Sequence, residues 1–255
     1  MPTPAERELA YYEDLYGGFA QQHFARPAVV AFRRYLAERI VAQTGAASRW
    51  RVLSLGCGIG DTEILLAPHV GEIVGVDLSR KAIEQARADA SRARIENVRF
   101  LAGNWQESLG AAGQFDLVLA VFFLHHLTEE ELTSAPHELA RVLRPGGTVY
   151  GLEPSARRLA GVVGRLFFRR LMKRYQTEDE RQLLAEPTAE LFRRAGYAAE
   201  THWFDFVSTP LAGLLPGWKT GYRAARWLDH GLVWTPVLRE GSANFELIAT
   251  RPGPG

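Results

Sequence analysis

The sequence predicts a single α/β domain built on a mostly parallel β-sheet with helices on both faces. Short apolar runs alternate with segments of helical periodicity up to Glu153, and the runs are apolar at consecutive positions, as strands buried on both faces are. A glycine-rich turn from Gly56 to Gly60 follows the first run, and Asp77 ends the second. A strand, a glycine turn and an acid on the neighbouring strand together predict a site for an adenosine-containing cofactor.

The individual elements follow from apolar spacing and capping signals. Seven runs are predicted as strands, namely Arg51–Leu55, Glu72–Val76, Asn97–Leu101, Phe115–Val121, Thr148–Leu152, Trp203–Val207 and Phe245–Thr250. Helices are expected at Tyr11–Gln43, Asp61–Ala67, Arg80–Ala93, Thr128–Val142 and Ala156–Tyr175, with another that ends near Ala195. Ser79 is the expected N-cap of one helix, Thr128 and Glu131 form a capping box, and Gly45 is a stop signal. Arg144–Gly147 is predicted as a turn.

Composition limits the possible partners and the cellular location. The 255 residues are 47% hydrophobic, which is enough for one sizeable core, and a net charge of +1 gives no strong attraction to nucleic acid. Cys57 is the single cysteine, so no intramolecular disulfide can form and no metal site is expected. Without an apolar leader or a run of about 18 apolar residues, we expect a cytoplasmic bacterial protein with no integral membrane segment, either a monomer or a homodimer.

The spacing of the glycines narrows the choice of cofactor. Gly56, Gly58 and Gly60 form G-x-G-x-G, and Asp61 stands where a dinucleotide site has its third glycine. An acid beside a pyrophosphate would repel it, so the loop favours a cofactor without phosphates. A carboxylate at Asp77 can accept both hydroxyl groups of an adenosine ribose.

Five motifs in chain order resemble those of the class I S-adenosylmethionine-dependent methyltransferases. They are Leu53–Gly60, Val74–Ser79, Phe100–Trp105, Phe115–Ala120 and Leu143–Gly147. The resemblance is close over Arg49–Glu153 and implies a Rossmann-like, seven-stranded methyltransferase fold. It also implies S-adenosylmethionine as the cofactor and S-adenosylhomocysteine as the product. One domain over 1–255 would then comprise an N-terminal helical lid (1–48), a cofactor-binding core (49–153) and a substrate side (154–255) whose helical, aromatic insert acts as a lid.

The resemblance assigns residues to the cofactor. Gly56, Cys57, Gly58 and Gly60 would contact the cofactor through the loop backbone, and Asp77 would bind the ribose. Leu78, Asn104 and Trp105 would contact the adenine. The backbone carbonyl near Ala120 would meet the ammonium group, and Tyr16 would belong to the lid. Cys57 is expected to fill space in the loop and not to act as a nucleophile. Ser54 and Asn104 depart from the family pattern, because Asp usually stands at the first position and often at the second.

The acceptor side is less well defined by the sequence. His125 and His126 follow the fourth strand, and one of them is a candidate general base, with a structural role as the alternative. Glu153 either contacts the substrate or holds the loop after the fifth strand. His23 and Tyr12 from the N-terminal segment are further candidates for contact with the substrate. Trp218 and Tyr222 belong to the insert Pro210–Gly241, which either roofs an apolar pocket or forms an ordinary satellite core.

The expected function is therefore methyl transfer from S-adenosylmethionine to an O, N or C atom of a small, largely apolar or aromatic molecule, in the manner of natural-product biosynthesis. Ala120–Phe123 lacks the proline-containing motif of nucleobase amino methyltransferases, which argues against that substrate class. Two alternatives stay open. One is a quinone or lipid methyltransferase at the membrane surface, where the basic stretch Ala156–Tyr175 would make peripheral contact. The other is a protein of this fold that binds the cofactor without transferring methyl.

Overall fold

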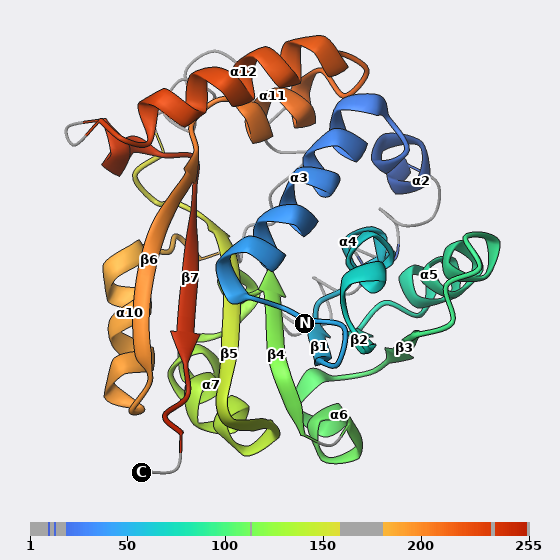
Figure 1. Ribbon diagram of the computed structural model, residues 1–255, viewed down its shortest axis with the longest axis vertical. Helices are drawn as coiled ribbons and strands as arrows, with labels where there is room; N and C mark the ends of the chain where they lie inside the picture. Colours follow the sequence, from blue (N-terminus) through green and yellow to red (C-terminus); the bar gives the residue numbers. More distant parts are fainter. Residues whose placement is uncertain are drawn as a thin grey trace.

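A seven-stranded sheet organises the chain. The computed structural model describes residue 10, residue 13 and residues 19–112, 114–158, 181–235 and 238–253. The strand order is β3-β2-β1-β4-β5-β7-β6 (Figure 1). Six strands run in the same direction, and β7 alone runs in the opposite direction. The strands are β1 (Arg51–Leu55), β2 (Glu72–Asp77), β3 (Val98–Ala102), β4 (Phe115–Val121), β5 (Leu143–Pro154), β6 (Ala198–Asp205) and β7 (Asn244–Thr250). The predicted mostly parallel, seven-stranded sheet is confirmed.

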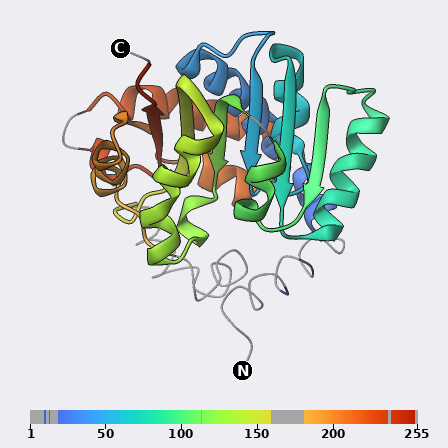
Figure 2. The ribbon, with the colours of Figure 1, turned by 90° about the horizontal axis from the view of Figure 1, so that it is seen from below.

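Helices cover both faces of this sheet (Figure 2). They are α2 (Phe19–Phe24), α3 (Pro27–Thr44), α4 (Asp61–Leu66), α5 (Arg80–Arg92), α6 (Trp105–Ala112), α7 (Glu129–Val142), α10 (Ala185–Arg194), α11 (Ser208–Leu214) and α12 (Lys219–Leu232). Alternate side chains of a strand point to opposite faces. Leu53 accordingly packs in a buried cluster with residues of α7 and α10, while Val52 packs in a second cluster with residues of α3, α11 and α12.

Capping residues identified in the sequence end or begin helices as expected. The Ser79 side chain accepts a hydrogen bond from Ala82 N, and Thr128 and Glu131 form a complete capping box. Gly45 ends α3 in the left-handed conformation, with φ +70°.

Several expected boundaries were wrong. The single helix expected over Tyr11–Gln43 is interrupted before Pro27, because proline favours the first turn of a helix and keeps Arg26 extended. Arg144–Gly147, expected as a turn, lies within β5, where the pairing with β4 shifts register and Gly146 has φ +79°. β6 begins at Ala198 and ends at Asp205, and α6 was not predicted at all.

Some sequence predictions concern residues outside the described part of the chain. These are Tyr12, Tyr16 and the stretch beyond Arg158 of the expected basic helix. Within the described ranges, no helix is both long and apolar enough to cross a membrane.

A buried ion pair fixes α3 to the sheet. Glu246, on β7, has no exposed surface, and Arg39 donates three hydrogen bonds to its carboxylate at 2.6–3.1 Å. Tyr150 of β5 donates a further hydrogen bond from its hydroxyl group at 2.7 Å. A buried carboxylate is costly unless it is paired. The contact therefore links α3 firmly to β5 and β7.

We predict that Arg39→Ala lowers the free energy of unfolding by about 3–5 kcal/mol, because it leaves a buried charge without its partner. Urea denaturation measures the change. Arg144→Ala is the matched control, since Arg144 pairs with Asp116 at 3.0 Å through a side chain that is 45% exposed. That loss should stay within about 1 kcal/mol. Equal losses for the two variants would contradict the role given to Arg39.

Candidate active site

The candidate residues lie at one edge of the sheet, because the loops that follow the parallel strands all begin at this edge. The glycine loop follows β1, Asp77 ends β2, and Glu153 lies one residue before the end of β5. Two histidines lie in the turn after β4, in the 3-10 helix Leu124–His126. In Figure 2 this is the lower edge, toward which the arrowheads of β1 and β2 point. α3, α11 and α12 lie together on one face of the sheet (Figure 1). Open α/β sheets bind their ligands at this edge.

The glycine loop depends on left-handed backbone. Gly56, Gly58 and Gly60 have φ of +62°, +52° and +72°, where any other residue would be strained. A Cβ atom on Gly60 would lie 2.4 Å from the ring of Phe100, so this glycine also allows close packing against β3. Gly56, by contrast, is exposed at the sheet edge.

Asp77 joins the glycine loop to the next strand. Its carboxylate accepts hydrogen bonds from Gly58 N at 2.8 Å and from Ser79 N at 2.9 Å. Burial raises the pKa of the Asp77 carboxyl, against the lowering effect of these two N–H groups. Each carboxylate oxygen has more than one acceptor position, so Asp77 can still accept a ligand hydroxyl. Leu78, next in the chain, is 44% exposed and offers an apolar surface beside it.

Glu63 is a second acid beside the loop, and the sequence analysis did not identify it. The Ser54 hydroxyl donates a hydrogen bond to Glu63 Oε1 at 2.6 Å, and both side chains are buried. Glu63 Oε2 is buried with no hydrogen-bond partner in the described part of the chain. Burial raises the pKa of Glu63 to about 7. The sequence does contain a signal for Glu63. Ser54 stands where the family usually has an acid, and Glu63 is an acid three residues beyond the glycine loop.

Asp61 is held by α3. Its carboxylate forms an ion pair with Arg33 at 2.9 Å, and Arg33 also donates to the Thr62 hydroxyl at 3.2 Å. Asp61, whose charge would repel a pyrophosphate, therefore lies at the start of α4 and is paired with Arg33.

Four other predicted cofactor residues are placed by the fold. Cys57 is buried against α5 and β3, and burial raises the pKa of its thiol well above the usual value. The Asn104 side chain accepts a hydrogen bond from Gln106 N at 2.8 Å at the start of α6. Trp105 is 6% exposed and belongs to the core, whereas Leu78 is accessible. Ala120 is buried, one residue before the end of β4.

The turn after β4 is strained. Phe122 adopts φ +54°, and its N–H donates to Leu152 O at 2.8 Å. Non-glycine residues in this region cost energy and occur preferentially at functional sites. The neighbouring Phe123 packs against the position where a Cβ of Gly56 would lie, 2.7 Å away, and against Trp105. The turn is therefore packed directly onto the glycine loop.

Glu153 builds the turn that carries the histidines. Its Oε1 accepts hydrogen bonds from Phe123 N at 3.0 Å and Leu124 N at 2.7 Å, and its Oε2 lies 2.6 Å from His125 Nδ1. Glu153 has no exposed surface, so these contacts support the loop-holding role, and a substrate contact stays a prediction. The half-buried His126 ring lies 3.9 Å from that of His125, and the charge of His126 contributes to lowering the pKa of Asp77.

The other predicted substrate residues lie elsewhere. His23 is half-buried in α2, with its ring edge-on to Phe24. Trp218 is 53% exposed, and Tyr222 is buried in the cluster that α3 shares with the sheet. Their substrate contacts stay predictions. In the described ranges no group of three or more His, Cys, Asp or Glu side chains could hold a metal ion.

The N-terminal segment meets this edge at one described residue. Glu13 Oε1 accepts a hydrogen bond from the Ser79 hydroxyl at 2.8 Å, and its carboxylate lies 3.7 Å from Lys81 Nζ. The contact lies two residues from Asp77. It lowers the pKa of Glu13, although desolvation acts in the opposite direction.

Comparisons with known proteins show which family the sequence is similar to. Residues 52–147 match the methyltransferase domain family. An uncharacterized methyltransferase of Bacillus subtilis, YcgJ, is 34% identical over 97 residues, which cover 38% of this chain and 38% of that protein. The demethylmenaquinone methyltransferase of Lactococcus lactis is 27% identical over 211 residues, covering 73% of this chain and 82% of the relative.

Solved structures share the fold. The N-methyltransferase NodS of Bradyrhizobium japonicum, solved in complex with S-adenosylhomocysteine, superposes with a TM-score of 0.61 at 18% identity. The superposition covers 96% of this chain and 98% of NodS. The domain match and the named relatives support a class I S-adenosylmethionine-dependent methyltransferase, and the solved structures share its fold.

Proposed function

We propose that this protein transfers a methyl group from S-adenosylmethionine to an oxygen, nitrogen or carbon atom of a small, largely apolar or aromatic molecule. The observation that carries the proposal is the pair of acids beside the glycine loop, the half-buried Asp77 and the buried Glu63. Asp77 is suited to the ribose hydroxyls and Glu63 to a cation. The relatives named as methyltransferases support it.

The residues fit a cofactor that carries an adenosine and a charged amino-acid group. S-adenosylmethionine would supply an electrophilic methyl group on a positively charged sulfur. Gly56 offers exposed backbone, Asp77 acceptor oxygens, and Leu78 an apolar surface for the adenine. Asn104, at the start of α6, is the candidate for the adenine amino group. Glu13, bound to the start of α5, supports a role for the N-terminal segment as a lid.

Glu63 takes the part of the acid that Ser54 lacks. The Ser54 hydroxyl orients one oxygen of Glu63, and the second oxygen is buried with no partner among the described residues. An unpartnered buried carboxylate is unfavourable, and a ligand ammonium group would satisfy it. Ionisation of Glu63 would then accompany binding of the cofactor.

For a hydroxyl or protonated amine acceptor, His126 is the proposed general base. His125 Nδ1 is held by Glu153, which fixes the turn on which both imidazoles lie. His126 is half-buried at the end of the 3-10 helix that follows β4. His125 and Glu153 would act as positioning residues, because both are engaged in holding the turn.

A quinone is the second candidate acceptor. This candidate is favoured by the relatives named demethylmenaquinone methyltransferase, of which the Lactococcus lactis protein aligns over 73% of this chain. A demethylated naphthoquinol is aromatic and apolar, and so falls within the acceptor class proposed here.

We predict that Asp77→Asn weakens binding of S-adenosylhomocysteine by about 1–3 kcal/mol, because one acceptor of the ribose hydroxyls is lost. Titration calorimetry on the purified protein measures the change. Asp116→Asn is the matched control. Asp116 likewise accepts a backbone N–H, that of Arg51 at 2.7 Å, but it lies at the opposite edge of the sheet. An unchanged affinity in Asp77→Asn would remove Asp77 from the site.

We predict that Glu63 makes the cofactor-free protein less stable as the pH rises. Its pKa of about 7 exceeds the usual 4.5, so the stabilisation is complete below about pH 4.5 and is lost as the pH rises through 7. The loss amounts to about 3 kcal/mol. Denaturation of wild type and Glu63→Gln at pH 5 and pH 8 isolates this contribution, because other groups cancel. A pH-independent difference would show that Glu63 titrates normally.

We predict that His126→Asn lowers the turnover number about 10²–10⁴-fold with little effect on cofactor binding, as loss of a general base does. The assay follows release of S-adenosylhomocysteine with a short-chain demethylmenaquinol and a panel of hydroxylated aromatics as acceptors. Unchanged turnover on an accepted substrate would assign His126 a structural role. Cofactor binding without turnover on any acceptor would favour the alternative that the protein does not transfer methyl.

A further inference from the structure

The exposed apolar side chains of the described residues gather on one part of the molecule. Within the described ranges, and apart from Leu78, every large hydrophobic side chain that is exposed lies between residues 207 and 238. These side chains are Val207, Leu214, Leu215, Trp218, Trp227, Leu228, Trp234 and Leu238. Trp227 and Trp234 are each 77% exposed. Contiguous exposed apolar groups on a soluble fold indicate an interaction surface. We call this region, residues 207–238, the α11–α12 surface.

Two cations share the outer face of α12 with Trp227. Lys219, Arg223 and Trp227 follow one another at four-residue spacing, and all three are exposed. This spacing places them along one side of a helix. Trp234, also exposed, lies in the turn after α12. The opposite side, which includes Tyr222 and Ala225, is buried.

The α11–α12 surface offers almost no negative charge. Between residues 206 and 241 the sequence contains two acids, Asp229 and Glu240. Asp229 is fully buried, and Glu240 forms an ion pair with Arg157 at 2.5 Å. The surface therefore combines aromatic and aliphatic groups with uncompensated cations, which complements a partner that is both anionic and apolar.

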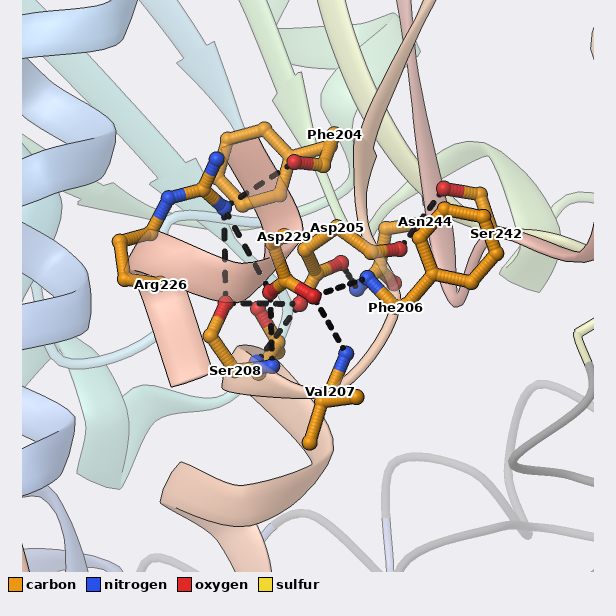
Figure 3. Close-up of polar contacts among 10 residues, drawn as sticks. Phe204, Asp205, Phe206, Val207, Ser208, Arg226, Asp229, Ser242 and Asn244 are labelled. Carbon is orange, nitrogen blue, oxygen red and sulfur yellow. Dashed lines mark hydrogen bonds and ion pairs between the residues drawn. The ribbon is translucent and has the colours of Figure 1, made fainter. Parts of the chain in front are cut away.

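Buried acids fix the base of this surface to the sheet (Figure 3). Asp229 of α12 accepts hydrogen bonds from three successive backbone N–H groups at the start of α11, those of Phe206, Val207 and Ser208. Asp205, at the end of β6, accepts hydrogen bonds from Thr209 N at 2.6 Å and from the Asn244 side chain at 2.7 Å. The two helices are thus held against the carboxyl edge of the sheet.

This location connects the surface with the candidate active site. β6 runs in the same direction as β1, β2, β4 and β5, so it ends at the same edge of the sheet, and α11 begins three residues after it. α11 and α12 pack together with α3 (Figure 1). A partner bound to the α11–α12 surface would lie next to the end of the protein that is proposed to take up an apolar acceptor.

We propose that the α11–α12 surface docks onto an anionic phospholipid bilayer. Trp227 and Trp234 insert at the level of the headgroups, where tryptophan is favoured, and Lys219 and Arg223 interact with lipid phosphates. The charge pattern selects a membrane over a neutral protein partner, because Lys219 and Arg223 lie on the same helix face as the exposed Trp227. The inference goes beyond the proposed function, since docking needs neither cofactor nor acceptor.

Vesicle flotation of the full chain tests the proposal. The vesicles contain phosphatidylcholine alone or phosphatidylcholine mixed with phosphatidylglycerol, and no methyl acceptor or cofactor is added. We expect wild type to bind the mixed vesicles and not the neutral ones. Trp227→Ser with Trp234→Ser, both exposed, should weaken binding at least tenfold. Lys219→Ala with Arg223→Ala should weaken it about 25-fold, at roughly fivefold per cation.

Control variants and a second measurement separate the outcomes. Arg141→Ala with Arg144→Ala removes two exposed cations from the opposite edge of the sheet and should leave vesicle binding unchanged. Sedimentation velocity reports the oligomeric state of wild type and of the tryptophan variant. Failure of wild type to bind anionic vesicles would overturn the proposal, and so would unchanged binding by the tryptophan variant. A wild-type dimer that becomes monomeric in this variant would assign the surface to a second copy of the chain.

Discussion

The edge of the sheet at which the cofactor is proposed to bind depends on the hydrogen bonds that the Asp77 carboxylate accepts. It accepts the N–H of Gly58 from the loop after β1 and that of Ser79 from the turn after β2, so two separate chain turns are held by one side chain. Three left-handed glycines allow the loop to reach it. Ser79 in turn caps α5 and binds Glu13, which brings the N-terminal segment to the same edge. A change at Asp77 therefore affects both ligand contacts and the shape of the edge.

The same construction recurs along the sheet. Glu153 accepts two backbone N–H groups of the turn after β4 and orients His125, and Asp205 accepts a backbone N–H at the start of α11. These acids are engaged in holding backbone. Glu63 differs, because its second oxygen has no hydrogen-bond partner in the described residues and burial raises its pKa to about 7. Among the acids of this edge, Glu63 is the one in which a ligand cation would relieve an unfavourable burial.

The sequence predicted the sheet well because buried parallel strands are apolar at every position and capping residues act locally. The parts it missed depend on tertiary contacts. Whether Leu78 or Trp105 is accessible follows from packing, since Trp105 turns into the core against Phe123. Glu63 acquires its importance only when α4 brings it to Ser54. The outward direction of Trp227 depends on which side of α12 is buried, and the sequence left the role of this insert open between a pocket roof and a satellite core.

The central claim is that Glu63 provides the carboxylate for the cofactor ammonium group beside the glycine loop. Proton release on ligand binding tests it most directly. Calorimetric titration of S-adenosylhomocysteine at pH 6.5, in two buffers of different ionisation enthalpy, counts the protons exchanged. With a pKa of about 7, Glu63 should release roughly three quarters of a proton as it ionises, and Glu63→Gln should lack this release. Equal proton counts for both proteins, with binding retained, would contradict the account.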